Sequence, residues 1–197
     1  GLSISAVYVS WVLLQIPGGL LMDRHDNRLL VGAGVAAYLV AAAGSYLAPT
    51  YPLFLLARAL GGASAVFIWT ASANVVATAF PASRRALGTS LFVASASAGF
   101  ALGQFLGPRV AAAAGWRAVF LVYPVATLVG VPLFALAARE PVRNGSSLSL
   151  GDFARTLRDP AVLAVSAASF CAYSLFLFFN SWMPAYATEV LGFDLSA

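Results

Sequence analysis

The sequence predicts an all-α membrane protein, a helical bundle with about six transmembrane helices. Of its 197 residues, 61% are hydrophobic and 9% are charged, whereas soluble domains are about 45–50% apolar and about 25% charged. The mean hydropathy is +0.87, so a soluble core of this size could not cover the apolar surface. These values exclude a soluble fold for most of the chain and make the lipid bilayer its main partner.

Six stretches reach the length of about 20 mostly apolar residues that a spanning helix requires. Their ends coincide with charged residues or proline: the first stops at the charged turn 23–28, the second near Pro49, and the fourth near Pro108. Only the third contains a charge well inside it, Arg58. We therefore expect helices at roughly 2–22, 29–48, 52–79, 86–108, 117–138 and 160–187.

The arginines indicate how these helices cross the membrane. All 11 basic residues are arginine. They concentrate in the first, third and fifth connections, so the positive-inside rule makes these connections cytoplasmic, and the first helix runs inward from outside. Positive charge between apolar runs indicates topology and not a nucleic-acid partner. The arginines of the odd connections are Arg24, Arg28, Arg84, Arg85, Arg139, Arg143, Arg155 and Arg158, and those of the fourth are Arg109 and Arg117.

The fifth connection divides the chain into two membrane parts. It is the longest and contains Asn144-Gly145-Ser146-Ser147, a composition typical of linkers. Because the first helix enters from outside, we expect an earlier helix and an internal piece of a longer protein. Residues 1–138 then hold transmembrane helices 2–6 of an N-terminal half. Residues 139–159 form a cytoplasmic central linker, and residues 160–197 hold helix 7 and the following external loop, the start of a C-terminal half.

The charged turn belongs to the stretch Gly19-Leu20-Leu21-Met22-Asp23-Arg24-His25-Asp26-Asn27-Arg28. This stretch resembles the signature loop of the major facilitator superfamily (MFS) of secondary transporters. That loop has a glycine, three apolar residues, Asp-Arg, and then usually a glycine and basic residues. Asp26 stands where the glycine is usual, and Asn27 where a basic residue is common. We expect a positive φ in this turn, which Asp and Asn tolerate better than other non-glycine residues. The matching residues are Gly19, Asp23, Arg24 and Arg28.

Three further stretches resemble the same family in order and spacing. "LLARALGGASA" is similar to its fourth-helix pattern, "GQFLGP" to its fifth, and "GWRAVFLV" to the start of its sixth. The resemblance covers nearly the whole chain. It implies a partial MFS-type bundle, with about six of twelve helices, helices 2 to 7, and inverted three-helix repeats around a midplane cavity.

The resemblance also implies a role for the charged loop. In this family the loop interacts with a helix of the other half and helps to hold one access state closed. A carboxylate near a helix N-terminus contributes about 0.3–1 kcal/mol when exposed and up to about 2 kcal/mol when partly buried. Such energies bias a two-state equilibrium without locking it. We therefore expect a cytoplasmic gate formed by Gly19, Asp23, Arg24 and Arg28.

Arg58 is the leading candidate for contact with a substrate, because a cation inside a span costs at least about 2.5–3.5 kcal/mol. At helical spacing Arg58, Gly62, Ala65, Trp69 and Ser72 share one face, which suits a cavity; snorkelling toward the outer surface is the alternative. The other candidates are polar or aromatic residues of the first and last helices, which can equally serve helix packing. The candidate substrate or coupling residues are Arg58, Trp69, Ser72, Gln15, Asn180 and Tyr173.

Small residues predict close helix contacts. Ser95, Gly99, Gly103 and Gly107 recur every four residues, a spacing that lets helices approach each other, and Pro108 allows a bend. The glycines that follow this proline in the family's antiporters are absent, so the motif does not imply antiport. The residues expected in helix packing and bending are Gly61, Gly62, Gly99, Gly103, Gly107 and Pro108.

The resulting expectation is a multi-pass permease of the plasma (inner, cytoplasmic) membrane. It moves a small solute by alternating access in a rocker-switch motion, with a coupling proton or ion as a further candidate partner; Arg58 favours an organic anion. The alternatives are an efflux antiporter for drugs or other hydrophobic compounds, a channel, and a non-transport membrane subunit or enzyme. No cofactor, metal site or enzymatic activity is expected, since the chain has one Cys and one His and no cluster of catalytic side chains.

Overall fold

The computed structural model describes residues 1–143 and 150–192, and all regular elements within these ranges are helices. The chain falls into two compact units, Gly1–Ser147 and Leu148–Ala197. Among the described residues, six helical segments are long and apolar enough to cross a membrane, which confirms the predicted spans. They are Leu2–Arg24, Asn27–Leu47, Tyr51–Ala79, Ala82–Ala114, Trp116–Ala137 and Pro160–Glu189.

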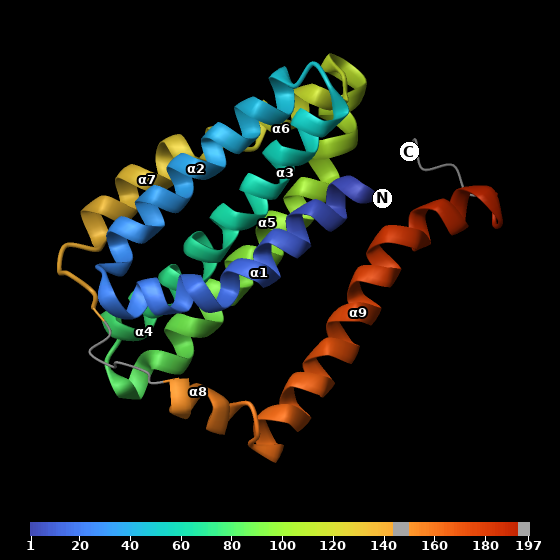
Figure 1. Ribbon diagram of the computed structural model, residues 1–197. Coiled ribbons are helices and arrows are strands. Elements are labelled where there is room, and N and C mark those ends of the chain that lie inside the picture. The colour runs from blue at the N-terminus through green and yellow to red at the C-terminus, as the bar shows by residue number, and fades with distance from the viewer. Residues whose placement is uncertain (144–149, 193–197) are drawn as a thin grey trace. The chain divides into compact units, whose positions relative to one another are not determined.

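The first three spans of the first unit pack together. They are α1 (Leu2–Arg24), α2 (Asn27–Leu47) and a third span made of α3 (Tyr51–Val66), a π-helix (Phe67–Ala71) and α4 (Ser72–Ala79). α3 lies against both α1 and α2 (Figure 1). The buried apolar cluster at their contact consists of Met22, Val31, Val66 and Ala71.

Much of the apolar surface of this unit stays outside that cluster. Leu13 in α1, for example, is 69% exposed. Soluble monomers rarely expose apolar surface of this extent. It suits helices that contact lipid or further helices of a bundle.

The fourth and fifth spans follow with two local irregularities. A 3₁₀ turn (Ala82–Arg84) leads into α5 (Arg85–Ala114). Gly115 then reverses the chain with a φ of +84°, which glycine adopts without steric cost, and a second 3₁₀ turn (Trp116–Ala118) begins the fifth span. Pro124 divides the rest of that span into α6 (Val119–Val122) and α7 (Val125–Ala137), because proline lacks the N–H that would continue the helix.

The predicted end of the fourth span near Pro108 is wrong. α5 continues through this proline to Ala114, as membrane helices can when neighbouring groups compensate for the missing hydrogen bond. Arg109 therefore lies inside the helix and not in the connection. Its guanidinium lies 3.8 Å from the centre of the Phe105 ring and donates to the Phe105 carbonyl oxygen at 2.8 Å.

The second unit contains α8 (Leu150–Thr156) and α9 (Pro160–Glu189). Asp159 caps α9, since its carboxylate accepts the N–H of Ala161 at 2.8 Å, and Pro160 suits the first helical position. α8 falls within the range 139–159 expected as a linker. The Asn-Gly-Ser-Ser stretch at residues 144–147 and the end of the expected external loop lie outside the described residues.

Candidate functional site

A group of polar and aromatic side chains joins the first span to the third within the apolar part of both. The side-chain N–H of Gln15 donates to the Thr70 hydroxyl at 3.4 Å, and its oxygen accepts the indole N–H of Trp11 at 3.1 Å. Trp69 packs on Phe92 of α5, with 4.6 Å between ring centres. We call these five residues, from three spans, the Gln15–Thr70 site.

A π-helix places two members of this site. Trp69 and Thr70 lie in the segment Phe67–Ala71, where the helix is wider than an α-helix. A π-turn rotates the residues that follow it relative to those before it, and such turns occur frequently at functional sites. Trp69 is 37% exposed and Gln15 is also exposed, so the site is open on the surface of this unit.

Arg58, Gly62 and Trp69, which the sequence places on one face, have different neighbours. The guanidinium carbon of Arg58 lies 5.2 Å from the centre of the Phe120 ring in α6. A Cβ on Gly62 would overlap the carbonyl oxygen of Val7 in α1, and Trp69 meets α5. The three residues thus contact three different helices. The π-helix at Phe67–Ala71 changes the register of Trp69 alone, since Arg58 and Gly62 both precede it in α3.

A second polar group lies where α1 joins α2. Asp26 is buried, with 7% of its surface exposed, and its carboxylate binds the Arg28 guanidinium at 2.7 Å. The same carboxylate accepts the backbone N–H groups of Arg28 and Val142, each at 3.1 Å. Arg28 also donates to the carbonyl oxygen of Ala138 at 2.9 Å. The turn between the first two spans is therefore bonded to the chain that follows α7.

Asn27 extends this group to α4. Its side-chain N–H₂ donates to the carbonyl oxygens of Met22 and Val142 at 3.0 Å each, and its side-chain oxygen accepts from Asn74 of α4 at 3.0 Å. The backbone N–H of Asn27 donates to the Val142 carbonyl oxygen at 2.8 Å. An amide such as Asn74 inside an apolar span is a sequence signal for such a contact, whereas a bond between residues 27 and 142 leaves no local pattern. We call Asp26, Asn27, Arg28, Asn74 and Val142 the Asp26 cluster.

Asp26 is the N-cap of α2, and the expected left-handed turn is wrong. Its φ is −66°, and no described residue other than glycine has a positive φ. An N-cap residue takes extended angles, and its side chain accepts an N–H of the first turn. The Arg28 guanidinium, helped by the N–H groups of Val142 and Arg28 and opposed by burial, lowers the pKa of the Asp26 carboxyl from its ordinary 3.8 to about 2.

The other residues of the signature loop lie on α1. Gly19 is half-buried, and a Cβ there would meet nothing within 4 Å. Asp23 and Arg24 are the last two residues of the helix. Within the described parts of the chain, neither side chain makes a hydrogen bond or ion pair, so the gate role of these three residues stays a prediction.

The small residues expected at helix contacts have different surroundings. A Cβ on Gly61 would lie 3.7 Å from a side chain of α2, whereas a Cβ on Gly99 would meet nothing within 4 Å. The hydroxyl oxygen of Tyr123 would lie 2.8 Å from a Cβ on Gly107 and 4.0 Å from one on Gly103. The same hydroxyl donates to the Gly103 carbonyl oxygen, so α5 and α6 approach closely just before Pro108.

The candidates of the second unit lie on α9. Tyr173 is 50% exposed and stacks on Phe176, with 5.9 Å between ring centres. The side chain of Asn180 donates to the Phe176 carbonyl oxygen, in its own helix, at 2.8 Å. Ser72, the remaining candidate, is the half-buried first residue of α4. No contact that bears on a ligand role is seen for these three within the described parts of the chain.

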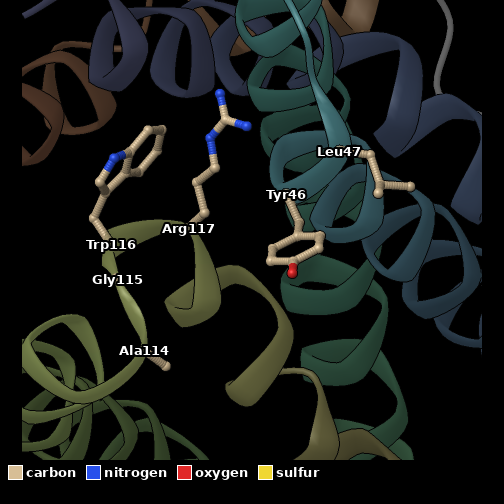
Figure 2. Close-up of a pocket in the computed structure, with 6 residues that line it drawn as sticks. All are labelled: Tyr46, Leu47, Ala114, Gly115, Trp116 and Arg117. Carbon is tan, nitrogen blue, oxygen red and sulfur yellow. The ribbon is translucent and has the colours of Figure 1, made fainter.

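A pocket of about 440 Å³ opens at the C-terminal end of α2 (Figure 2). The Arg117 guanidinium carbon lies 5.3 Å from the centre of the Trp116 ring, which packs edge-on against Phe54. All the lining residues are exposed and only Arg117 is charged, so no buried polar group fixes a ligand there. The lining residues are Tyr46, Leu47, Ala114, Gly115, Trp116 and Arg117.

Among the described residues, no three His, Cys, Asp or Glu side chains gather as a metal site requires.

Comparison with known families follows the whole length of the chain. The sequence profile of the Major Facilitator Superfamily matches residues 1–197. The chain belongs to this superfamily. With six helices able to cross a membrane, this MFS chain is a multi-pass integral membrane protein.

Several curated proteins match this MFS chain along most of its length. The probable nitrate/nitrite antiporter NarK1 of Thermus thermophilus is 26% identical over 219 residues, which cover 98% of this chain and 48% of NarK1. The probable galactarate/D-glucarate transporter GudP of Bacillus subtilis is 23% identical over 228 residues, covering 99% and 50%. Protein spinster homolog 1 of Xenopus tropicalis is 31% identical over 147 residues, covering 73% and 28%. The chain thus spans about half or less of the length of these relatives.

A solved structure supports the same fold. The peptide transporter POT, crystallised in complex with sulfate, superposes with a TM-score of 0.58 at 21% identity, over 92% of this chain and 38% of that one. At this identity the likeness concerns the fold alone. The predicted partial MFS bundle is confirmed, and the relatives NarK1 and GudP are named as transport proteins and not as enzymes.

Proposed function

We propose that this MFS chain is part of a secondary active transporter that moves a small solute by alternating access. The observation that carries the proposal is the Gln15–Thr70 site, where an amide, a hydroxyl and aromatic rings from three spans lie together. Polar side chains exposed to hydrocarbon are costly unless they face a water-filled cavity or other protein groups. The exposed Gln15 therefore suits the wall of a cavity that the rest of the transporter completes.

A small anion is the substrate class that we propose. NarK1 is named for nitrate and nitrite and GudP for galactarate and D-glucarate, and a relative from Oryza sativa, 26% identical over 218 residues, is named a probable anion transporter. Arg58 supplies positive charge in the same span as Thr70. A cation in a low-dielectric region attracts anions over several ångströms, so Arg58 can act from its place over Phe120 without contact with the substrate.

Efflux of a hydrophobic compound is the second candidate function. The rings of Trp11, Trp69 and Phe92 give the Gln15–Thr70 site a largely apolar surface, which favours an aromatic or otherwise apolar ligand. The methylenomycin A resistance protein of Bacillus subtilis is 25% identical over 204 residues. Transport of an anion and of an uncharged drug can be told apart with labelled compounds.

The signature loop is proposed as part of the cytoplasmic gate, with the orientation that the positive-inside rule gives. Arg28 is engaged by Asp26, and it holds the loop in shape from within the unit. Asp23 and Arg24, together with Gly19, are the residues that we propose for contact with the other half. A coupling proton or ion remains a further candidate partner of the whole transporter.

The division of the chain follows from this proposal. Residues 1–138 form helices 2–6 of the N-terminal half, and residues 160–197 begin the C-terminal half with helix 7. Residues 139–159 connect the halves on the cytoplasmic side. The division of the chain into the compact units Gly1–Ser147 and Leu148–Ala197 supports a boundary in this range.

The test is uptake by the full-length protein in proteoliposomes, with labelled nitrate, D-glucarate and an uncharged aromatic drug as solutes. Thr70→Val should raise the KM for the transported solute about two- to tenfold, because a lost hydrogen bond is worth about 0.5–1.5 kcal/mol. Thr127→Val is the matched control, since within the described part of the chain the Thr127 hydroxyl bonds to the Pro124 carbonyl of its own span and to no other group. Equal KM values for the two variants would remove the Gln15–Thr70 site from the proposal. Drug transport without anion transport would favour the second candidate, and no transport at all would favour a non-transport membrane subunit.

A further inference from the structure

The chain that leaves α7 is bonded through its main chain to the turn between α1 and α2. The two main-chain polar groups of Val142 are both bonded there, the N–H to the Asp26 carboxylate at 3.1 Å and the carbonyl to the backbone N–H of Asn27 at 2.8 Å. Four residues earlier, the Ala138 carbonyl oxygen accepts from Arg28. Both ends of the segment Ala138–Val142 are thus hydrogen-bonded to the turn through main-chain atoms.

Burial makes these bonds hard to exchange for bonds to water. Asn27 is completely buried, and Asp26 and Val142 are 7% and 8% exposed. If the segment left, the Asp26 carboxylate and the Asn27 amide would each lose a partner in a site from which water is largely excluded. Buried polar groups left without partners are strongly unfavourable. The arrangement in which the segment Ala138–Val142 stays bonded to the α1–α2 turn is therefore the stable one.

The same cluster is hydrogen-bonded to residues at or near the ends of four membrane spans. Asn27 bonds to the Met22 carbonyl at the end of α1 and to Asn74 in α4, while it begins α2 itself. Arg28 and Asp26 add the chain after α7. A displacement of the segment Ala138–Val142 would therefore disturb the ends of the first, second, third and fifth spans together.

We propose that the Asp26 cluster is a latch that fixes the segment Ala138–Val142 to the α1–α2 turn, so that the first unit moves as one body as far as Val142. The role in movement rests on the alternating-access function proposed above; the latch itself does not. The end of α7 is then not the point at which the chain changes its course between access states. Asp26 and Arg28 are positioning residues in this account, since they act through the chain that joins the halves and not on a solute.

Hydrogen–deuterium exchange of the full-length protein in nanodiscs tests the latch directly. Asp26→Ala should speed exchange in peptides covering residues 138–143 by about tenfold or more, because the acceptor of the Val142 N–H is lost. Arg28→Lys, a milder change that keeps the positive charge, should speed it by a smaller factor and decides the matter if Asp26→Ala does not fold. Glu189→Ala is the matched control, since it also removes a carboxylate, at the exposed end of α9, and it should leave exchange at the wild-type rate. Wild-type rates in both cluster variants, or equal acceleration in the control, would overturn the latch.

Transport measured on the same variants tests the role in movement. Opening of the latch should lower the turnover rate several-fold and leave solute affinity unchanged. A variant with fast exchange and wild-type turnover would show that the latch exists but does not couple the halves, which overturns that part of the proposal. If the wild-type protein transports nothing, the proposed function fails while the exchange result still decides whether the latch exists.

Discussion

Asp26 combines three roles in one carboxylate. It caps α2, pairs with Arg28 and binds the N–H of Val142. The signature loop that this turn resembles usually has glycine at this place, and glycine could perform none of the three. The departure from the family pattern therefore marks a bond network that this chain has in addition to the expected gate charges.

Acid should weaken the Asp26 cluster only at low pH. Because the folded-state pKa of Asp26, about 2, lies below its ordinary 3.8, the ionised carboxylate stabilises the folded state at neutral pH. This stabilisation is lost as the pH falls from about 4 toward 2, while Arg28 stays protonated. Thermal unfolding of the purified full-length protein, wild type against Asp26→Ala, measures it as a Tm difference. That difference should be constant from about pH 7 to 5 and shrink below about 4; a decline already complete at pH 5 would contradict the account.

Gly62 should tolerate no larger side chain. Its Cβ would overlap the Val7 carbonyl oxygen and the Ser10 hydroxyl of α1, so Gly62→Ala must push α1 away from α3. The expected loss is about 1–3 kcal/mol of unfolding free energy. Gly99→Ala is the control, because nothing lies within 4 Å of that Cβ, and a helical alanine is favoured over glycine by about 1 kcal/mol. Thermal unfolding of both variants should give Tm shifts of opposite sign, and similar shifts would refute the predicted contact.

At the scale of whole elements, two helices depart from the regular form. The third span widens into a π-helix at Phe67–Ala71, and the fifth breaks at Pro124. The length and apolar composition of both spans are plain in the sequence, since a membrane helix needs about 20 apolar residues. The π-helix is not, because no residue pattern in "FIWTA" demands it. The helical spacing from Arg58 to Trp69 therefore does not hold beyond Val66.

The contact between α5 and α6 offers a prediction about element packing. A Cβ on Gly107 would lie 2.8 Å from the Tyr123 hydroxyl oxygen but 4.0 Å from the nearest ring carbon. Gly107→Ala should therefore destabilise the protein, and Tyr123→Phe should cost about 0.5–1.5 kcal/mol for the lost bond to Gly103. The double variant should lose less than the sum of the two, because the atom that obstructs the new methyl group is gone. Tm values that add without coupling would mean that the helices do not approach at Gly107.

At the scale of the whole molecule, the family and the membrane spans follow from sequence, whereas most of the site does not. The loop Gly19–Arg28 and three further motifs identify the superfamily, which the match over residues 1–197 confirms. Contacts that join distant residues, such as Gln15 with Thr70 or Asp26 with Val142, depend on how the helices pack and leave no spacing to read. The gate and substrate roles of individual residues stay predictions, because the chain spans about half or less of its relatives' length.

Counterflow tests the central claim, transport by alternating access, most directly. Proteoliposomes containing the full-length protein are loaded with unlabelled solute and diluted into a trace of the labelled one, nitrate or D-glucarate. A carrier that exposes one site to one side at a time exchanges the two, so labelled solute should accumulate transiently above its outside concentration and then decline. Label that only equilibrates, at a rate independent of the solute inside, would identify a channel and contradict alternating access.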